Sequence, residues 1–185
     1  DVQGVAELTT AVITAGHRDL AVLTGPPNLS TSRERLAGYR QAVAAAEIPE
    51  VERGGRGGPR SRVLVCPFST EGGAEALARL ADDLPQAVLA LSSRLVMGVL
   101  RGCGERNIRI PDDLSVAGLG DPEWFAFWQP GITTYAPPLP EMGRRAAETL
   151  LALLDEDAPA PPTGAQRMLG TVRIRQSVRG LRPSS

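Results

Sequence analysis

The stretch that decides the fold is IPDDLSVAGLGDPEWF, which runs from Ile110 to Phe125. Its apolar run from Leu114 to Ala117 is typical of a short strand that is buried on both faces. The run stops at a glycine, and a second glycine and an acid follow closely. Gly118 and Gly120 would let the backbone leave the sheet and approach a bound molecule, or they would simply allow a tight exit turn.

Similar short apolar runs recur upstream of this stretch, and helical patterns separate them. The runs predict strands at residues 20–24, 63–66 and 87–91. The patterns predict helices at residues 3–15, 32–47, 71–84 and 93–103, and Thr31 and Glu34 have capping-box spacing. Because buried strands alternate with amphipathic helices, the sequence predicts an α/β fold with a doubly wound parallel sheet.

The pattern changes after residue 129. It predicts a short strand at 132–135, a helix at 141–154 and a half-buried strand at 171–175. The helix carries two adjoining apolar stripes, and so wide an apolar face belongs to a helix that other elements cover. We therefore expect residues 137–178 to dock on the rest of the chain, on another copy or on a further part of a longer protein. The Gly- and Arg-rich segment 53–62 predicts a surface loop.

Composition excludes several classes of protein. The 185 residues are 42% hydrophobic with a formal net charge of −1, which suits one or two globular domains and gives no electrostatic footprint for nucleic acid. No apolar run reaches the roughly 18 residues that a membrane span needs, and no signal peptide is visible. Cys66 and Cys103 read as reduced core cysteines of a cytoplasmic protein. With His17 as the single histidine, we expect no metal site and no cofactor.

Four loops should carry any function, because a doubly wound sheet binds ligands outside the carboxyl ends of its strands. These loops are 25–30, 67–70, 92–93 and 118–122. They hold no catalytic set: Ser92 and Ser93 lack a base, since His17 belongs at the opposite end of a strand. A glycine-rich phosphate loop is also absent from the sequence. The sequence therefore predicts that the protein is not an enzyme.

An ordered set of motifs carries a family resemblance. The motifs are AGHRDLAVLTGP (15–26), SRERLAGYR (32–40), E-x-G-x-E-A (71–76), MGVLR (97–101), IPDDLSVAGLGD (110–121) and ITTYAPPLPEMGRRAA (132–147). Together they resemble the effector-binding domain of the LacI/GalR family of bacterial transcriptional regulators. The resemblance implies the two-lobed, type I periplasmic-binding-protein-like fold, in which a small molecule lies between the lobes.

The resemblance also implies a division of the chain. Residues 1–131 would be the second lobe, and residues 132–185 would be a crossover strand, a helix and a terminal strand returning to a first lobe that is absent here. Operator DNA would be bound only through a missing N-terminal domain. The function implied is effector sensing and dimerisation for transcription control. A solute-binding protein of a transport system, which shares the fold, is the alternative.

Particular residues match the family's ligand contacts. Arg35 matches an arginine that forks onto ligand hydroxyls or a carboxylate, and Phe68 matches an aromatic group that covers the apolar face of the ligand. Ser92 and Gly120 occupy positions where the family usually has an amide and an acid. Since carboxylates and amides bind sugar hydroxyls, these departures leave open whether the effector is sugar-like.

Four of the seven aromatic residues lie within five positions: Trp124, Phe125, Phe127 and Trp128. In the family this region lies at or near the contact between two subunits, and aromatic residues are enriched at interfaces. The resemblance therefore implies a homodimer that uses these rings. Alternatively, the rings close the base of their own lobe.

Overall fold

The computed structural model describes residues 1–52, 58–154, 164 and 167–181. They form a six-stranded sheet with the order β2-β1-β3-β4-β5-β6. Strands β1 to β5 are parallel, and β6 pairs antiparallel with β5. Their bounds are β1 Asp19–Thr24, β2 Arg60–Val65, β3 Ala87–Ala90, β4 Ser115–Leu119, β5 Thr133–Ala136 and β6 Thr171–Arg173. The predicted α/β class with a doubly wound parallel sheet is confirmed.

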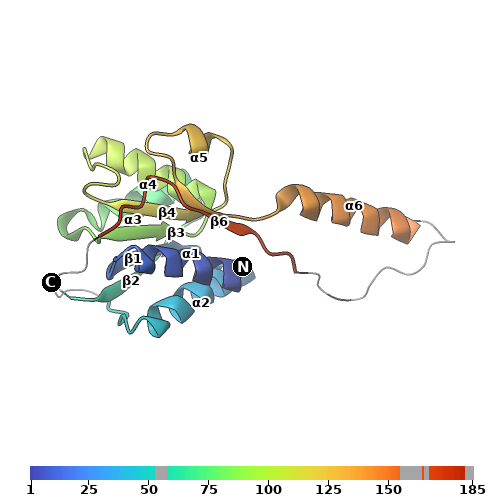
Figure 1. The fold of residues 1–185 in the computed structure, drawn as a ribbon, viewed down its shortest axis with the longest axis horizontal. Helices are drawn as coiled ribbons and strands as arrows, with labels where there is room; N and C mark the ends of the chain where they lie inside the picture. Colours follow the sequence, from blue (N-terminus) through green and yellow to red (C-terminus); the bar gives the residue numbers. More distant parts are fainter. Residues whose placement is uncertain (53–57, 155–163, 165–166, 182–185) are drawn as a thin grey trace.

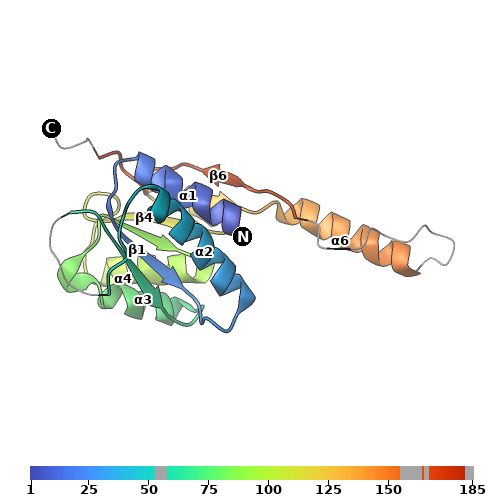
Figure 2. The same cartoon turned by 90° about the horizontal axis from the view of Figure 1, so that it is seen from below.

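Helices cover both faces of this sheet (Figures 1 and 2). Two helices, α1 (Val2–Thr14) and α2 (Ser30–Ala45), lie on one face. The other face carries α3 (Thr70–Ala78), a short 3-10 turn (Ala81–Asp83) and α4 (Ser93–Glu105). The short helix α5 (Trp124–Phe127) follows β4, and α6 (Leu139–Leu154) follows β5.

Successive side chains of a strand point to opposite faces of the sheet, and each face carries its own apolar core. Leu20 and Val22 of β1 pack with Leu8 and Val12 of α1 on one face of the sheet. Their neighbours Ala21 and Leu23 join a second core beneath α3 and α4, with members such as Leu77, Leu95, Val99 and Val116. Because both of their faces are buried, the central strands β1 and β3 read as continuous apolar runs rather than alternating ones.

Glycines set two close approaches in the second core. Gly98 of α4 lies against Gly73 of α3, and a Cβ built at Gly98 would be only 2.7 Å from the Gly73 Cα. Gly118 lies inside β4 rather than at its end, so the predicted strand end is wrong by two residues. A side chain at Gly118 would overlap Val96 of α4, and this contact explains the glycine. The positive φ of 91° at Gly120 provides the exit turn.

The predicted surface loop 53–62 extends too far, because its last three residues belong to β2. Residues 53–57 lie outside the described residues, but Arg60 and Arg62 begin β2, and both are buried. The Arg60 guanidinium donates to Asp19 at 2.6 Å and to Asp83 at 2.9 Å, and Arg62 contacts the same two carboxylates at 3.1 Å each. Buried charges persist only when they are paired in this way, which is why an arginine-rich segment can form a strand.

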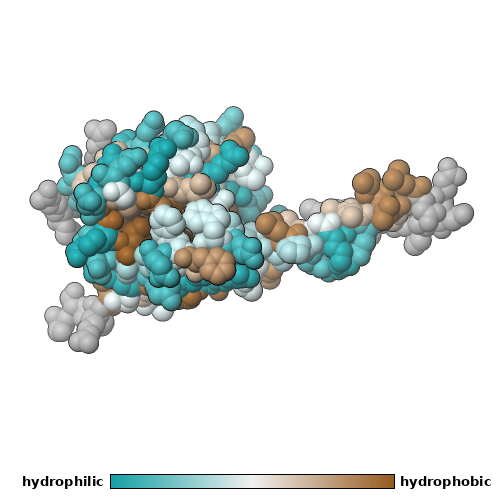
Figure 3. All heavy atoms as spheres, turned by 90° about the horizontal axis from the view of Figure 1, so that it is seen from above, coloured by the Kyte–Doolittle hydropathy of each residue, from teal (hydrophilic) through white to brown (hydrophobic). Residues whose placement is uncertain are grey.

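The strands on either side of the predicted boundary after residue 131 form one sheet. Both β5 and β6 belong to the same six-stranded sheet as β1 to β4, because β4 pairs with β5 and β5 with β6. Among the described helices and strands, α6 alone projects away from the sheet and the helices that cover it (Figure 1). No residue of α6 is buried, and Figure 3 shows apolar surface gathering toward its far end. The exposed fraction of Leu154 there reaches 73%. We expected residues 137–178 to dock on the rest of the chain, on another copy or on a further part of a longer protein. Within the described residues, β6 docks on the rest of the chain and α6 does not.

Candidate functional site

The structure brings the predicted ligand contacts together at the carboxyl edge of the parallel strands. Arg35, in the second turn of α2, donates from Nη1 to the carbonyl of Leu91 at 2.9 Å, next to Ser92. The guanidinium carbon of Arg35 also lies 5.8 Å from the centroid of the Phe68 ring, within the range of a cation–π contact. Segments that follow β1, β2 and β3 therefore converge on one guanidinium.

The position of Phe68 depends on Gly25, the residue that follows β1. A Cβ at Gly25 would overlap the Phe68 ring, so glycine makes room for the ring to lie over the end of β1. Phe68 itself is half-buried and packs against the second core. Part of its surface thus supports the lobe, and the rest is available beside Arg35.

Arg35 has a partner that the sequence did not suggest. Its Nε donates to the carboxylate of Asp1 at 2.8 Å, and Nη2 has no hydrogen-bond partner among the described residues. Burial lowers the pKa of Arg35, opposed by the charge of Glu34, but a guanidinium stays protonated at neutral pH. Its orientation is fixed, while one donor group remains available for a bound molecule.

Ser92 and Gly120 complete this edge. The Ser92 hydroxyl accepts a hydrogen bond from the backbone N–H of Leu95 at 3.2 Å and so caps α4. A Cβ at Gly120 would lie 3.5 Å from the Cβ of Ser93, so the turn after β4 lies against the start of α4. Arg35 thus lies beside Phe68, and Gly120 lies against Ser93, next to Ser92, along the same edge. The role of the four predicted residues in ligand binding stays a prediction.

Asp121 is the functional candidate that sequence reasoning largely missed. Its side chain is only 5% exposed and accepts from Arg175 at 2.7 and 2.9 Å, from Arg173 at 2.8 Å and from Thr134 at 2.8 Å. Burial alone would raise the pKa of Asp121, but the hydrogen bonds from Arg175 and Thr134 outweigh it and lower the pKa. The signal that could have found it is the pair Arg173 and Arg175 on one face of the predicted strand 171–175, since both form ion pairs with Asp121.

The aromatic cluster divides between the two expected roles. Phe125 is fully buried in the second core, as the alternative role of closing the base of its own lobe requires. Trp124, Phe127 and Trp128 are exposed by 37%, 77% and 43%. The Trp124 ring meets Phe125 edge-on at 4.4 Å and Trp128 at 6.0 Å. An apolar outer surface on a fixed base is therefore present, and its use in dimerisation stays a prediction.

His17 lies away from this edge. It is fully buried; Nδ1 is 3.1 Å from the carbonyl of Val12 and Nε2 is 2.9 Å from the hydroxyl of Ser115. Burial lowers the pKa of His17, which favours the neutral ring. Among the described residues no group of three or more His, Cys, Asp or Glu side chains could hold a metal ion.

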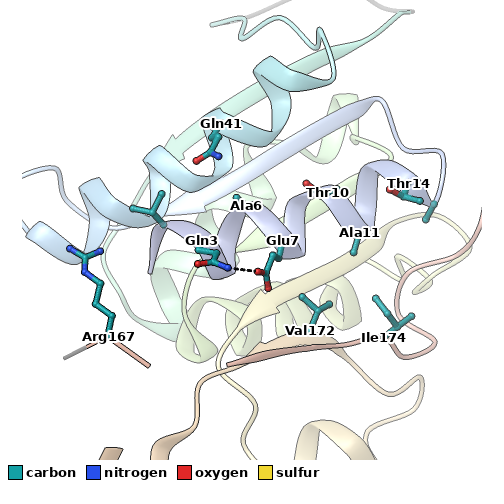
Figure 4. A pocket seen from close by; sticks show the side chains of 12 residues that line it. Gln3, Ala6, Glu7, Thr10, Ala11, Thr14, Gln41, Arg167, Val172 and Ile174 are labelled. Atoms are coloured by element: carbon teal, nitrogen blue, oxygen red, sulfur yellow. Dashed lines mark hydrogen bonds between the residues drawn. The ribbon is translucent and has the colours of Figure 1, made fainter. Parts of the chain in front are cut away.

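A wide groove lies elsewhere in the described part of the chain. It has a volume of about 1050 Å³ and lies between the outer face of α1 and β6 (Figure 4). Small and apolar side chains such as Ala6, Ala11 and Val172 line much of it, and two of its polar side chains, Gln3 and Glu7, hydrogen-bond to each other at 2.9 Å. Because ligand sites need polar groups that converge on the ligand, we place the candidate site at the strand edge instead.

None of the helices in the described ranges is both long and apolar enough to cross a membrane.

A doubly wound sheet with polar and aromatic contacts gathered at the carboxyl ends of its strands is typical of α/β proteins that bind a ligand at that edge. Residues 9–178 match the model of the periplasmic binding protein-like domain. The chain belongs to that family, and its relatives are LacI-type transcriptional regulators, which confirms the resemblance found in the sequence.

Two curated relatives illustrate this. The chain is 32% identical to the ribose operon repressor of Haemophilus influenzae over 145 residues, which are 77% of this chain and 41% of that protein. It is 30% identical to the transcriptional regulator DegA of Bacillus subtilis over 150 residues, or 80% of this chain and 42% of that protein. The chain thus spans about half the length of the curated relatives it matches or less.

Solved structures agree with this assignment. The transcriptional repressor ascG of Escherichia coli is 26% identical with a TM-score of 0.79, covering 96% of this chain and 61% of that one. A LacI family regulator from Enterococcus faecium with bound ribose is 25% identical with a TM-score of 0.81, covering 98% and 64%. These relatives are named as regulators and not as enzymes, which confirms the prediction of a non-enzyme.

Proposed function

We propose that this chain is the effector-sensing and dimerisation part of a bacterial LacI/GalR-type transcriptional regulator. Such a regulator would bind a small molecule between two lobes and thereby control DNA binding by another domain of a longer, cytoplasmic protein. The observation that carries the proposal is the convergence of Arg35, Phe68 and the Leu91–Ser92 segment at the carboxyl edge of the sheet. These groups offer a planar donor beside an apolar ring, which suits a small hydroxylated molecule.

A sugar-like effector is favoured, with fewer contacts from this lobe than the family usually makes. The Enterococcus faecium relative is described with bound ribose. In this chain, however, Gly120 offers no side chain, and the Ser92 hydroxyl already caps α4. The acid beside Gly120 is committed to Arg173 and Arg175. Arg35 and Phe68 therefore carry most of the recognition on this side.

The exposed helix α6 supports the presence of a companion lobe, which would cover the apolar face of this helix. Its apolar residues include Leu150, Leu151, Leu153 and Leu154, which are all more than half exposed. Burying a leucine side chain stabilises a protein by about 1.5–3 kcal/mol, so this face is suited to packing in a companion lobe. Half a cleft would also bind its effector weakly.

Titration with ribose tests the proposed function. We expect backbone amide NMR signals of Phe68, Ser92 and Gly120 to shift together as ribose is added to the chain, with a dissociation constant in the millimolar range that half a cleft allows. Amides at the opposite end of the sheet, such as Arg60, should not shift and serve as the control. If ribose and the disaccharide cellobiose both leave the strand-edge signals unchanged, the proposed sugar site is contradicted.

The alternative, a solute-binding protein of a transport system, would use the same edge for its ligand. The named relatives favour the regulator, since they are repressors and regulators that match most of this chain. The exposed rings of α5 also favour it, because a self-associating surface suits a dimeric regulator better than a carrier that works alone.

Dimerisation is expected to depend on the exposed aromatic rings. Phe127 is the best residue to change, because it is 77% exposed and its loss should not disturb the core. We expect Phe127→Ala to weaken self-association by about fivefold or more, as loss of an aromatic interface anchor typically costs more than about 1 kcal/mol. Sedimentation or light scattering against concentration measures this.

Leu29→Ala is a matched control for this substitution, since Leu29 is a 41% exposed apolar residue on the other side of the sheet. Equal molecular masses for the two variants at every concentration would show that the aromatic cluster is not the interface.

A further inference from the structure

The turn of the candidate ligand site is held by the last strand of the sheet. Asp121 directly follows Gly120, and its buried carboxylate receives both terminal nitrogens of Arg175 and one of Arg173. Both arginines come from the segment in and just after β6, more than fifty residues further along the chain. The Asp121 carboxylate therefore lies at the ligand edge but forms ion pairs within the chain.

The strand β5 lies between the turn and β6 and is bonded to both. The backbone N–H of Gly120 donates to the carbonyl of Tyr135 at 2.9 Å, and Thr134 donates to Asp121. On the other side, the Thr133 hydroxyl accepts the backbone N–H of Arg175 at 2.9 Å. Further along, the hydroxyl of Tyr135 accepts the backbone N–H of Gly170 at 2.6 Å. The turn, β5 and β6 thus form one hydrogen-bonded unit.

This unit carries α6. The chain leaves β5 at Ala136 and enters α6 at Leu139, and it returns to the lobe at Gly170 to form β6. Gly170 fits closely there, because a Cβ at this position would overlap the backbone of Ala136. Ala136 at the end of β5 and Gly170 just before β6 are therefore fixed side by side at the edge where the ligand turn lies.

We propose that Asp121 is a positioning residue that couples the ligand-site turn at Gly120 to the β5–β6 pair carrying α6. A bound effector that moves the turn would shift β6 through the carboxylate, and a shift of α6 would likewise be felt at the turn. Coupling of this kind requires a physical connection between the two sites, and the Arg175 guanidinium supplies it. The regulatory meaning rests on the proposed function, but the coupling does not need a ligand to be measured.

Amide hydrogen exchange of Gly120 tests the coupling in the chain as it is. Arg175→Gln removes the charge just after β6 without touching the Gly120 amide, which is bonded to Tyr135. We expect exchange of the Gly120 amide to rise by roughly tenfold or more, since a hydrogen bond to a charged group is a strong one. The Leu91 amide, which donates to Leu23 at 3.0 Å on the same edge, should keep its rate.

Arg173→Gln is the matched control, because Arg173 is 57% exposed and gives Asp121 a single hydrogen bond. It should change the Gly120 rate by less than about threefold, as expected for an exposed ion pair. Equal effects of Arg175→Gln on Gly120 and Leu91 would mean that Arg175 only stabilises the lobe as a whole, and the coupling would be rejected.

A conservative variant covers the case in which Arg175→Gln does not fold. Arg175→Lys keeps the positive charge but loses the two-pronged contact, so it should raise the Gly120 rate in the same direction and by less. An unchanged Gly120 rate in a folded Arg175→Lys chain would overturn the proposal. A failed ribose titration together with a selective rise at Gly120 would reject the sugar site but leave the coupling in place.

Discussion

Replacing Arg35 with alanine is expected to weaken ribose binding by roughly tenfold to a hundredfold, because a hydrogen bond from a charged group contributes about 1.5–3 kcal/mol. The guanidinium is held by Asp1 and the Leu91 carbonyl beside Phe68, so the variant loses a donor whose orientation is already fixed. Dissociation constants from the NMR titration measure the effect.

Arg33→Ala controls for the general loss of positive charge on α2. Arg33 lies two residues earlier and donates to the Pro27 carbonyl at 3.0 Å, on the exposed side of the helix. It should bind ribose as the unchanged chain does. If both variants keep the same affinity, Arg35 does not contact the effector and the site must be sought elsewhere on the lobe.

Gly98→Val is expected to lower the free energy of unfolding by about 3 kcal/mol or more, near the upper end of what overpacking usually costs. A Cβ at Gly98 would lie 2.7 Å from the Gly73 Cα and 2.8 Å from the backbone nitrogen of Ala74, and it would overlap the Thr70 carbonyl. Backbone atoms cannot rotate away as a side chain does, so α3 and α4 must separate. The midpoint and slope of urea unfolding measure this cost.

Gly104→Ala provides the matched control in the same helix. Nothing lies within 4 Å of a Cβ built at Gly104. Because alanine is a better helix former than glycine by up to about 1 kcal/mol, this variant should be neutral or slightly stabilised. Similar urea midpoints for the two variants would show that the α3–α4 crossing tolerates separation and that the packing argument is wrong.

Most of the secondary structure could be predicted because each element carries its own signal. The run from Leu20 to Thr24 is apolar on both faces and is followed by Gly-Pro-Pro, so β1 is visible without any knowledge of its neighbours. The place of Gly118 within β4 could not be predicted, because a glycine inside a strand and a glycine at its end look alike in sequence. Only the position of Val96 on α4 decides between them.

Contacts between distant segments could not be predicted. Arg60 and Arg62 resemble loop residues until Asp19 and Asp83 are placed beside them. The capping-box pair was also misleading, since Thr31 lies inside α2 and Leu29 occupies the cap position. Of the ligand edge, the family motifs indicated Arg35 and Phe68, but neither spacing nor composition could reveal Asp1 as the partner of Arg35.

The solitary position of α6 limits the cooperativity of the whole chain. Ion pairs of Glu141 with Arg144 and Arg145, at 2.6 and 2.7 Å, lie within the helix itself. A helix of this length without tertiary support is only marginally stable in water. Since α6 buries nothing against the lobe, its melting and that of the lobe are separate events, and no single transition describes both. Every unfolding free energy measured on this chain is therefore a property of the lobe, to which α6 contributes almost nothing.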